Sequence, residues 1–138
     1  MAVYTDVSDA EAQTLVAALQ LGELTALEGI SGGIENSNFF MTVATEAQTE
    51  TYVLTLFERL NHEQLPYYLR LMQHLAGKGL AVPAPVANAD GEILHTVAGK
   101  PAAVVSKLSG KSQLAPTAHH CQAMGDTLAR MHLAGADF

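Results

Sequence analysis

The chain has 138 residues, a formal net charge of −7, and 49% apolar against 15% charged residues. This composition excludes an intrinsically disordered chain, because such chains lack the apolar residues needed to build a core. The basic residues are scattered, which argues against nucleic-acid binding, and no apolar run approaches the roughly 20 residues that span a membrane. The N-terminus lacks a secretion signal and Cys121 is the single cysteine, so we expect a cytoplasmic domain or part of one.

The first half of the chain predicts one helix and three strands. Residues 7–22 predict a helix with Ser8 as N-cap, Glu11 at the capping-box spacing, and Gly22 as its end. Residues 24–30 predict a strand, although 23–28 would also extend the helix. Residues 38–44 and 51–57 are rich in β-branched and aromatic residues and predict two strands joined by the polar turn 45–50. Together the strands predict an antiparallel meander.

The second half predicts two helices around a second group of strands. Apolar residues at helical spacing predict a helix over 65–78, with Pro66 in its first turn. Two prolines keep 80–86 extended, and the Asp-Gly signal in 87–92 precedes predicted strands at 93–97 and 100–106. A linker at 109–113 leads to a helix over 117–133, in which we expect Cys121 to be a small core residue. Adjacent strands with segregated helices predict an α+β fold.

A glycine-rich stretch, Gly29–Phe40, lies between the first two predicted strands and also holds two serines and two asparagines. Glycine lets a backbone approach a ligand closely, and successive backbone N–H groups in such a turn form a concave anion site. The stretch therefore indicates a hairpin that covers phosphate. The alternative is an ordinary surface hairpin with flexible turn residues.

Taken together, these segments resemble the small lobe of the kinase-like fold in the aminoglycoside and choline phosphotransferase superfamily, and within it the bacterial homoserine kinases. The segments that carry the resemblance are Met1–Ser8, Gly29–Phe39 with its Glu35-Asn36-Ser37-Asn38, Tyr52–Glu58, Leu65–Ala76, Val82–Pro85, Gly99–Val105 and Leu128–Phe138. The resemblance implies a nucleotide-binding lobe at 1–108 with an antiparallel sheet of about five strands, a packed helix and an extra N-terminal helix. A hinge or linker at 109–116 and the first helix of a large lobe at 117–138 would follow.

The same resemblance implies transfer of the γ-phosphoryl group of ATP to the side-chain hydroxyl of L-homoserine, with Mg²⁺, in threonine biosynthesis. The loop would cover the phosphates and the strand end near 106–108 would contact adenine. The implied nucleotide-binding residues are Ser31, Gly32, Gly33, Ile34, Glu35, Asn36, Asn38, Val53, Thr55, Ser106, Lys107 and Leu108. The superfamily's His-Gly-Asp catalytic motif and later metal-binding Asp are absent from the sequence. We therefore expect an N-terminal piece with no catalytic or metal-ligating residue, inactive on its own.

The chain departs from the usual kinase pattern at one ion pair. Thr55 stands where the third strand normally carries Lys, and Tyr68 stands near the position of the Glu that pairs with it. Losing both together avoids a lone, partly buried charge. Arg59 is the nearest cation that would reach phosphate; the alternative is a solvated Arg beside Glu58 or Glu63.

Other residues and the whole chain also have alternative interpretations. Glu35 is expected to face solvent, with Mg²⁺ or substrate contact as the alternative. We expect His132 to make a structural hydrogen bond to a large lobe and Asp126 to be solvated. The alternatives for the chain are a phosphotransferase for an amino sugar or choline-like alcohol, or a non-catalytic remnant that binds ATP or forms oligomers through the bare apolar stripe of its last helix.

Overall fold

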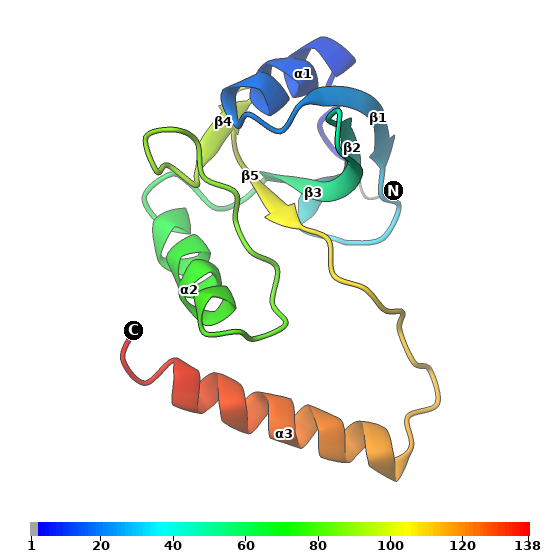
Figure 1. Ribbon diagram of the computed structural model, residues 1–138, viewed down its shortest axis with the longest axis vertical. Helices are drawn as coiled ribbons and strands as arrows, with labels where there is room; N and C mark the ends of the chain where they lie inside the picture. The colour runs from blue at the N-terminus through cyan, green and yellow to red at the C-terminus, as the bar shows by residue number, and fades with distance from the viewer. Residues whose placement is uncertain (1–2) are drawn as a thin grey trace.

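The computed structural model describes residues 3–138; Met1 and Ala2, which begin the Met1–Ser8 segment, lie outside the described residues. Its elements follow the order that the sequence predicts, so the α+β expectation is confirmed (Figure 1). They are α1 (Asp9–Ala18), β1 (Glu23–Gly29), β2 (Asn36–Ala44), β3 (Thr49–Phe57), α2 (Leu65–Gly77), β4 (His95–Val97), β5 (Lys100–Ser106) and α3 (Ala118–Ala134). No helix within residues 3–138 is long and apolar enough to cross a bilayer.

The five strands form one antiparallel sheet in the order β1-β2-β3-β5-β4. Alternate side chains of β2 are buried, which is the pattern of a strand with one face on the core. The extended segment before β4 adds a single bridge from Pro85 to Val105 of β5. The strand β5 therefore lies inside the sheet, with β3 on one side and β4 on the other.

The two faces of the sheet are covered differently. The helix α1 packs on the first face, where Leu15 and Val16 meet Phe39, Met41 and Leu54 in the main core. On the opposite face lies a smaller cluster, built from Leu69 of α2 with Ile93, Ala103 and Phe57. Figure 1 shows α1 and α2 on opposite sides of the sheet. Phe40, Val53 and Thr55 on this second face are only half-buried, so the face is covered only in part.

The first helix has the predicted start and a different end. Ser8 and Glu11 form a complete capping box, as the sequence predicts. The helix stops at Ala18 rather than at Gly22, and Gln20 already has a left-handed φ of 56°. Gly22 follows with φ +105°, where an added Cβ would lie 2.3 Å from the Ala44 carbonyl oxygen. The glycine therefore lets β1 start against the end of β2, which settles residues 23–28 as strand.

In the second half, α2 begins with Pro66 in its first turn, as predicted. The strand predicted over 93–97 is shorter, at His95–Val97, although Ile93 is buried. The tight β4–β5 turn follows, with φ of 50° at Ala98 and 74° at Gly99. Two left-handed residues match the twist of a two-residue hairpin, so this turn joins β4 directly to β5.

No residue of α3 is buried, and Cys121 is exposed, so the expectation of a core cysteine is wrong. The helix meets the rest of the chain near its C-terminal end. There His74 Nε2 lies 3.0 Å from the Ala134 carbonyl oxygen and 2.9 Å from Asp137 Oδ1, and Lys78 Nζ donates to Asp137 Oδ2 at 2.6 Å. The role expected for His132 stays a prediction. Met131 of the apolar stripe lines a hollow with Leu71 and Leu75 of α2, whereas Met124, Leu128 and Leu133 of the stripe stay exposed.

Candidate functional site

The glycine-rich loop joins β1 to β2 and is closed at its base by a backbone hydrogen bond from Ile30 N to the Asn38 carbonyl oxygen, at 2.9 Å. Gly33 has φ +123°, a conformation that L side chains rarely adopt. Gly32 has no such φ, and a Cβ there would meet nothing within 4 Å. Ile34, at the tip, is 80% exposed. The backbone of the loop is therefore accessible, and one of its two central glycines is required by conformation.

Beside this loop, the strand register aligns side chains in two rows on the partly open face. Phe40, Val53 and Val105 lie directly opposite one another on β2, β3 and β5 and form an apolar row. Asn38, Thr55 and Ala103 form the next row, closer to the loop. The face thus changes from apolar to polar toward the glycine-rich loop.

The polar row is tied together by side-chain hydrogen bonds. Thr55 Oγ1 donates to Asn38 Oδ1 at 2.7 Å, and Asn38 Nδ2 donates to the Asn36 carbonyl oxygen at 3.4 Å. The resemblance places Thr55 where typical kinase lobes carry Lys, and in the structure the Thr55 side chain pairs with the neutral Asn38. Of the residues expected from the sequence, Asn36, Asn38, Val53 and Thr55 are therefore neighbours.

The far end of the apolar row meets the strand end at 106–108. Lys107 Nζ lies 4.8 Å from the centroid of the Phe40 ring, a cation–π contact. Ser106 N already donates to the Ala84 carbonyl oxygen at 3.0 Å, so any backbone donor at this hinge comes from Lys107 or Leu108. Phe40, Ala103 and Val105 were not among the residues predicted for the site. The period-two pattern of each strand contains them, but the sequence does not reveal which strands are adjacent.

Two charged residues lie at the loop tip; Glu35 is placed as expected from the sequence, and Arg59 is not. Arg59 Nη1 lies 3.7 Å from Glu35 Oε1, with the two side chains 73% and 65% exposed. Glu35 faces solvent, as expected, while Arg59 pairs with neither Glu58 nor Glu63. An exposed pair at this distance contributes little to stability. Arg59 is therefore an exposed cation near the loop, held only by a weak ion pair.

Glu58 belongs to a separate hydrogen-bond network on the α1 face of the sheet. The sequence pattern does not reveal this network. Its Oε1 accepts from Ser37 Oγ at 2.6 Å and from Thr5 Oγ1 at 2.7 Å, and Lys100 Nζ donates to Oε2. Burial acts to raise the pKa of Glu58, but the hydrogen bonds from Lys100, Ser37 and Thr5 outweigh it and lower the pKa. The Glu58 side chain is 11% exposed and ionised, so this pair fixes the end of β3 to the start of β5.

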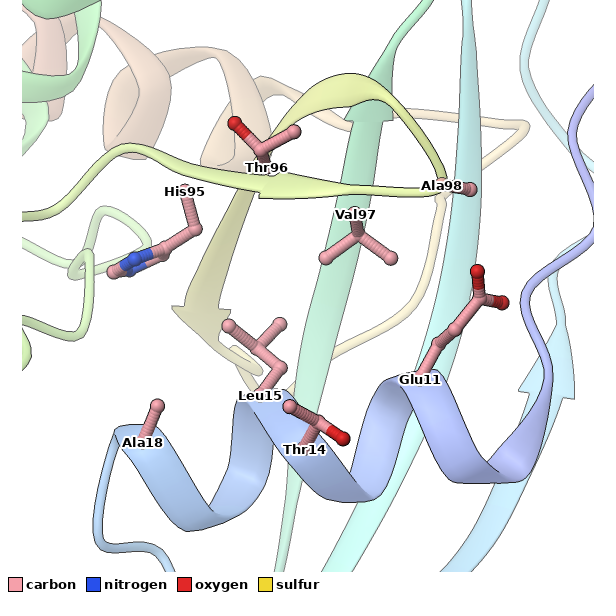
Figure 2. A pocket seen from close by; sticks show the side chains of 8 residues that line it. All are labelled: Glu11, Thr14, Leu15, Ala18, His95, Thr96, Val97 and Ala98. Atoms are coloured by element: carbon pink, nitrogen blue, oxygen red, sulfur yellow. The ribbon is translucent and has the colours of Figure 1, made fainter.

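Two cavities lie near these elements. A hollow of about 260 Å³ beside the loop tip is lined by Tyr4, Ile34, Glu35, Glu58 and Arg59. A cavity of about 380 Å³ lies between α1 and β4, with Leu15 and Val97 facing each other across it and the His95 ring turned away from Glu11 (Figure 2). This second cavity is on the α1 side and is no part of the two rows.

The described residues offer no ready-made metal centre. Among residues 3–138 there is no group of three or more His, Cys, Asp or Glu side chains placed to hold an ion.

Comparisons with known proteins find similarity over most or all of the chain. The sequence profile described as "Phosphotransferase enzyme family" matches residues 26–138. Over all 138 residues, the chain is 59% identical to a homoserine kinase of Cupriavidus taiwanensis, 56% to one of Polaromonas naphthalenivorans and 53% to one of Burkholderia multivorans. It covers 41%, 42% and 40% of those proteins, so it spans about two fifths of the length of the curated relatives it matches.

A solved structure agrees with the fold. The amicoumacin kinase hAmiN in complex with AMP-PNP, Ca²⁺ and Ami superposes with a TM-score of 0.65 and 22% identity, over 90% of this chain and 39% of that one. The kinase-like lobe predicted from the sequence is therefore confirmed as a fold. The profile match, the relatives and this neighbour agree, and the chain belongs to the phosphotransferase enzyme family.

Proposed function

We propose that this chain is the nucleotide-binding lobe of an ATP-dependent phosphotransferase whose acceptor is the side-chain hydroxyl of L-homoserine. The observation that carries the proposal is the 53–59% identity to homoserine kinases over the entire chain, combined with an accessible glycine-rich loop above a half-open sheet face. The fold neighbour holds AMP-PNP, which supports a nucleotide as the ligand. A place in threonine biosynthesis and in the cytoplasm belongs to the same proposal.

The two rows of side chains fit the two ends of ATP. The apolar row of Phe40, Val53 and Val105 offers a surface for the adenine ring, next to the hinge backbone of Lys107 and Leu108. The polar row and the loop lie toward the other end, where Asn38 and the backbone N–H groups of 31–36 would hold phosphate oxygens. The proposed nucleotide contacts are those expected from the sequence, Ser31, Gly32, Gly33, Ile34, Glu35, Asn36, Asn38, Val53, Thr55, Ser106, Lys107 and Leu108, with Phe40 and Val105 added.

Charge neutralisation is the part of the reaction that these residues do not complete. Phosphoryl transfer requires positive charge around the phosphates and a group that orients the acceptor hydroxyl. Here Thr55 replaces the usual Lys, Arg59 is exposed, and the described residues form no metal site. We therefore propose that the 138 residues bind the nucleotide but do not transfer phosphate alone, and that residues corresponding to the rest of the longer relatives supply the catalytic groups and the metal ligands.

A chimera tests whether this lobe can serve a homoserine kinase. The 138 residues would replace the matching segment of the Cupriavidus taiwanensis homoserine kinase, to which they are 59% identical. We expect the chimera to consume ATP with L-homoserine and not with choline or an aminoglycoside, while the isolated 138 residues show no turnover. Turnover by the isolated chain would refute the proposal that residues outside these 138 supply the catalytic groups. A folded chimera without turnover of L-homoserine would count against the homoserine kinase proposal and favour a phosphotransferase with a different acceptor.

One observation favours a further alternative, an oligomerising remnant. Met124, Leu128 and Leu133 of α3 are 67%, 48% and 79% exposed, and such apolar patches promote association. Light scattering of the purified chain separates the two ideas. A concentration-dependent oligomer without ATP binding favours the remnant, and a monomer that binds Mg-ATP favours the nucleotide lobe.

A further inference from the structure

We propose that the N-terminal residues Tyr4 and Thr5 clamp the glycine-rich loop, and that Tyr4 is a positioning residue for the phosphate-covering conformation. The inference rests on the proposed function, because it concerns the loop that would lie over ATP. Tyr4 comes before the first helix and is 30 residues away in sequence from the loop residue it contacts. Nothing in a glycine-loop motif points to it.

The contact at the loop tip is a hydrogen bond from Tyr4 Oη to the Ile34 carbonyl oxygen, at 3.1 Å. The tip has little else to hold it. Ile34 is 80% exposed, a Cβ on Gly32 would meet no atom within 4 Å, and the Arg59–Glu35 pair is open and solvated at 3.7 Å. The Tyr4 hydroxyl is thus a fixed donor on an otherwise weakly supported loop.

The clamp itself is held by a satisfied polar network at the loop's other end. Tyr4 N and Thr5 N both donate to Ser37 Oγ, at 2.8 and 3.0 Å, and Ser37 Oγ donates its own proton to Glu58 Oε1 at 2.6 Å. A hydroxyl has one proton and two lone pairs, so Ser37 is fully used. Ser37 is also fully buried, and Thr5 Oγ1 reaches the same Glu58 oxygen at 2.7 Å. The backbone carrying the Tyr4 ring is therefore fixed to β2 and β3.

A fixed loop matters for affinity because a ligand binds only the fraction of molecules whose loop is in the competent shape. The apparent Kd equals the intrinsic Kd divided by that fraction. Deleting one exposed, neutral hydrogen bond lowers the fraction modestly. For Tyr4→Phe we expect the Kd for Mg-ATP to rise by about two- to fivefold, since such a bond is at the weak end of the measured range.

The experiment compares Tyr4→Phe with Tyr67→Phe in the 138-residue chain. Both changes remove one tyrosine hydroxyl, from residues that are 56% and 61% exposed, and Tyr67 lies on α2 away from the loop. Hydrogen exchange of the free chain reports on the loop, and calorimetry reports the Kd for Mg-ATP. We expect Tyr4→Phe to speed exchange at residues 31–35 and to raise the Kd, with the melting temperature close to that of Tyr67→Phe. Tyr67→Phe should change neither loop exchange nor Kd.

Each other outcome counts against the proposal. Unchanged exchange at 31–35 in Tyr4→Phe overturns the clamp, whether or not the chain binds ATP. Faster exchange with an unchanged or lower Kd overturns the positioning role. If the parent chain binds no Mg-ATP, the proposed function and the positioning role both fail, while the exchange data on the free chain still decide whether the clamp exists.

Discussion

Gly33 is the position where the loop's backbone geometry makes the sharpest prediction. Its φ of +123° lies beyond the left-handed α region, so an L residue there costs at least the roughly 1–2 kcal/mol of that region, and a branched side chain costs more than alanine would. Space is not the obstacle, because an added Cβ would meet only Asn38 Nδ2, at 3.6 Å. In Gly33→Val the loop must therefore bear this strain or leave the observed conformation.

This conformational penalty weakens the binding of the nucleotide. A penalty of about 1–2 kcal/mol lowers the equilibrium constant for the observed loop conformation by about 5–30-fold, and the apparent Kd for Mg-ATP rises by up to the same factor. Because the loop is exposed and can relax, we expect the stability of the sheet to change little. Calorimetry gives the Kd, and far-UV circular dichroism with a melting curve checks the fold.

Gly32→Val is the matched control, because Gly32 has no left-handed φ and open space around it. If backbone conformation is the only requirement, Gly32→Val binds Mg-ATP much better than Gly33→Val. If both variants lose binding equally, the phosphates approach the Gly32 backbone as well. A Gly33→Val chain that binds as tightly as the parent would refute the role assigned to this loop.

Three further predictions concern the scaffold. Glu58→Gln should destabilise the chain by about 1.5–3 kcal/mol at pH 7, because Lys100 loses a charged partner. The lowered pKa of Glu58 means that its stabilisation is present above the ordinary glutamate pKa of about 4.3 and is lost as pH falls through the folded-state value, so urea titrations of Glu58→Gln should depend less on acid pH; an unchanged pH dependence would contradict this. Gly22→Ala should cost at least about 2 kcal/mol in urea unfolding, because its Cβ would meet the Ala44 carbonyl oxygen, whereas Gly77→Ala, with nothing within 4 Å, should be neutral or stabilising; equal effects would refute the packing argument. Asp137→Asn weakens the contacts to Lys78 and His74, which hold the pKa of Asp137 low, and should speed hydrogen exchange in the last turn of α3 but not in the sheet; unchanged protection there would show that these contacts do not hold the helix.

Local patterns predicted the elements that depend on neighbouring residues. Ser8 and Glu11 predict the start of α1, because a capping box is contained within four consecutive positions. The end of α1 could not be placed in the same way. Gly22 is glycine because of its contact with Ala44 in another strand, not because it ends a helix.

Long-range features of the site were hidden from sequence reasoning for a similar reason. The pairing of Glu58 with Lys100 and the row formed by Phe40, Val53 and Val105 depend on which strands are adjacent, which only the sheet order reveals. The exposed Cys121 shows that an apolar helix stripe does not by itself predict burial. An apolar stripe indicates that a helix face is to be covered, but it does not say whether the covering surface lies within the same stretch of chain.

The central claim is that ATP binds to the half-open face beneath the glycine-rich loop. Its most direct test is a titration of the isotopically labelled 138-residue chain with Mg-ATP, followed by backbone amide chemical shifts. The account predicts saturable shifts concentrated at residues 30–38, 53–55 and 105–108. No shifts at millimolar Mg-ATP, or shifts concentrated around the α1–β4 cavity instead, would contradict it.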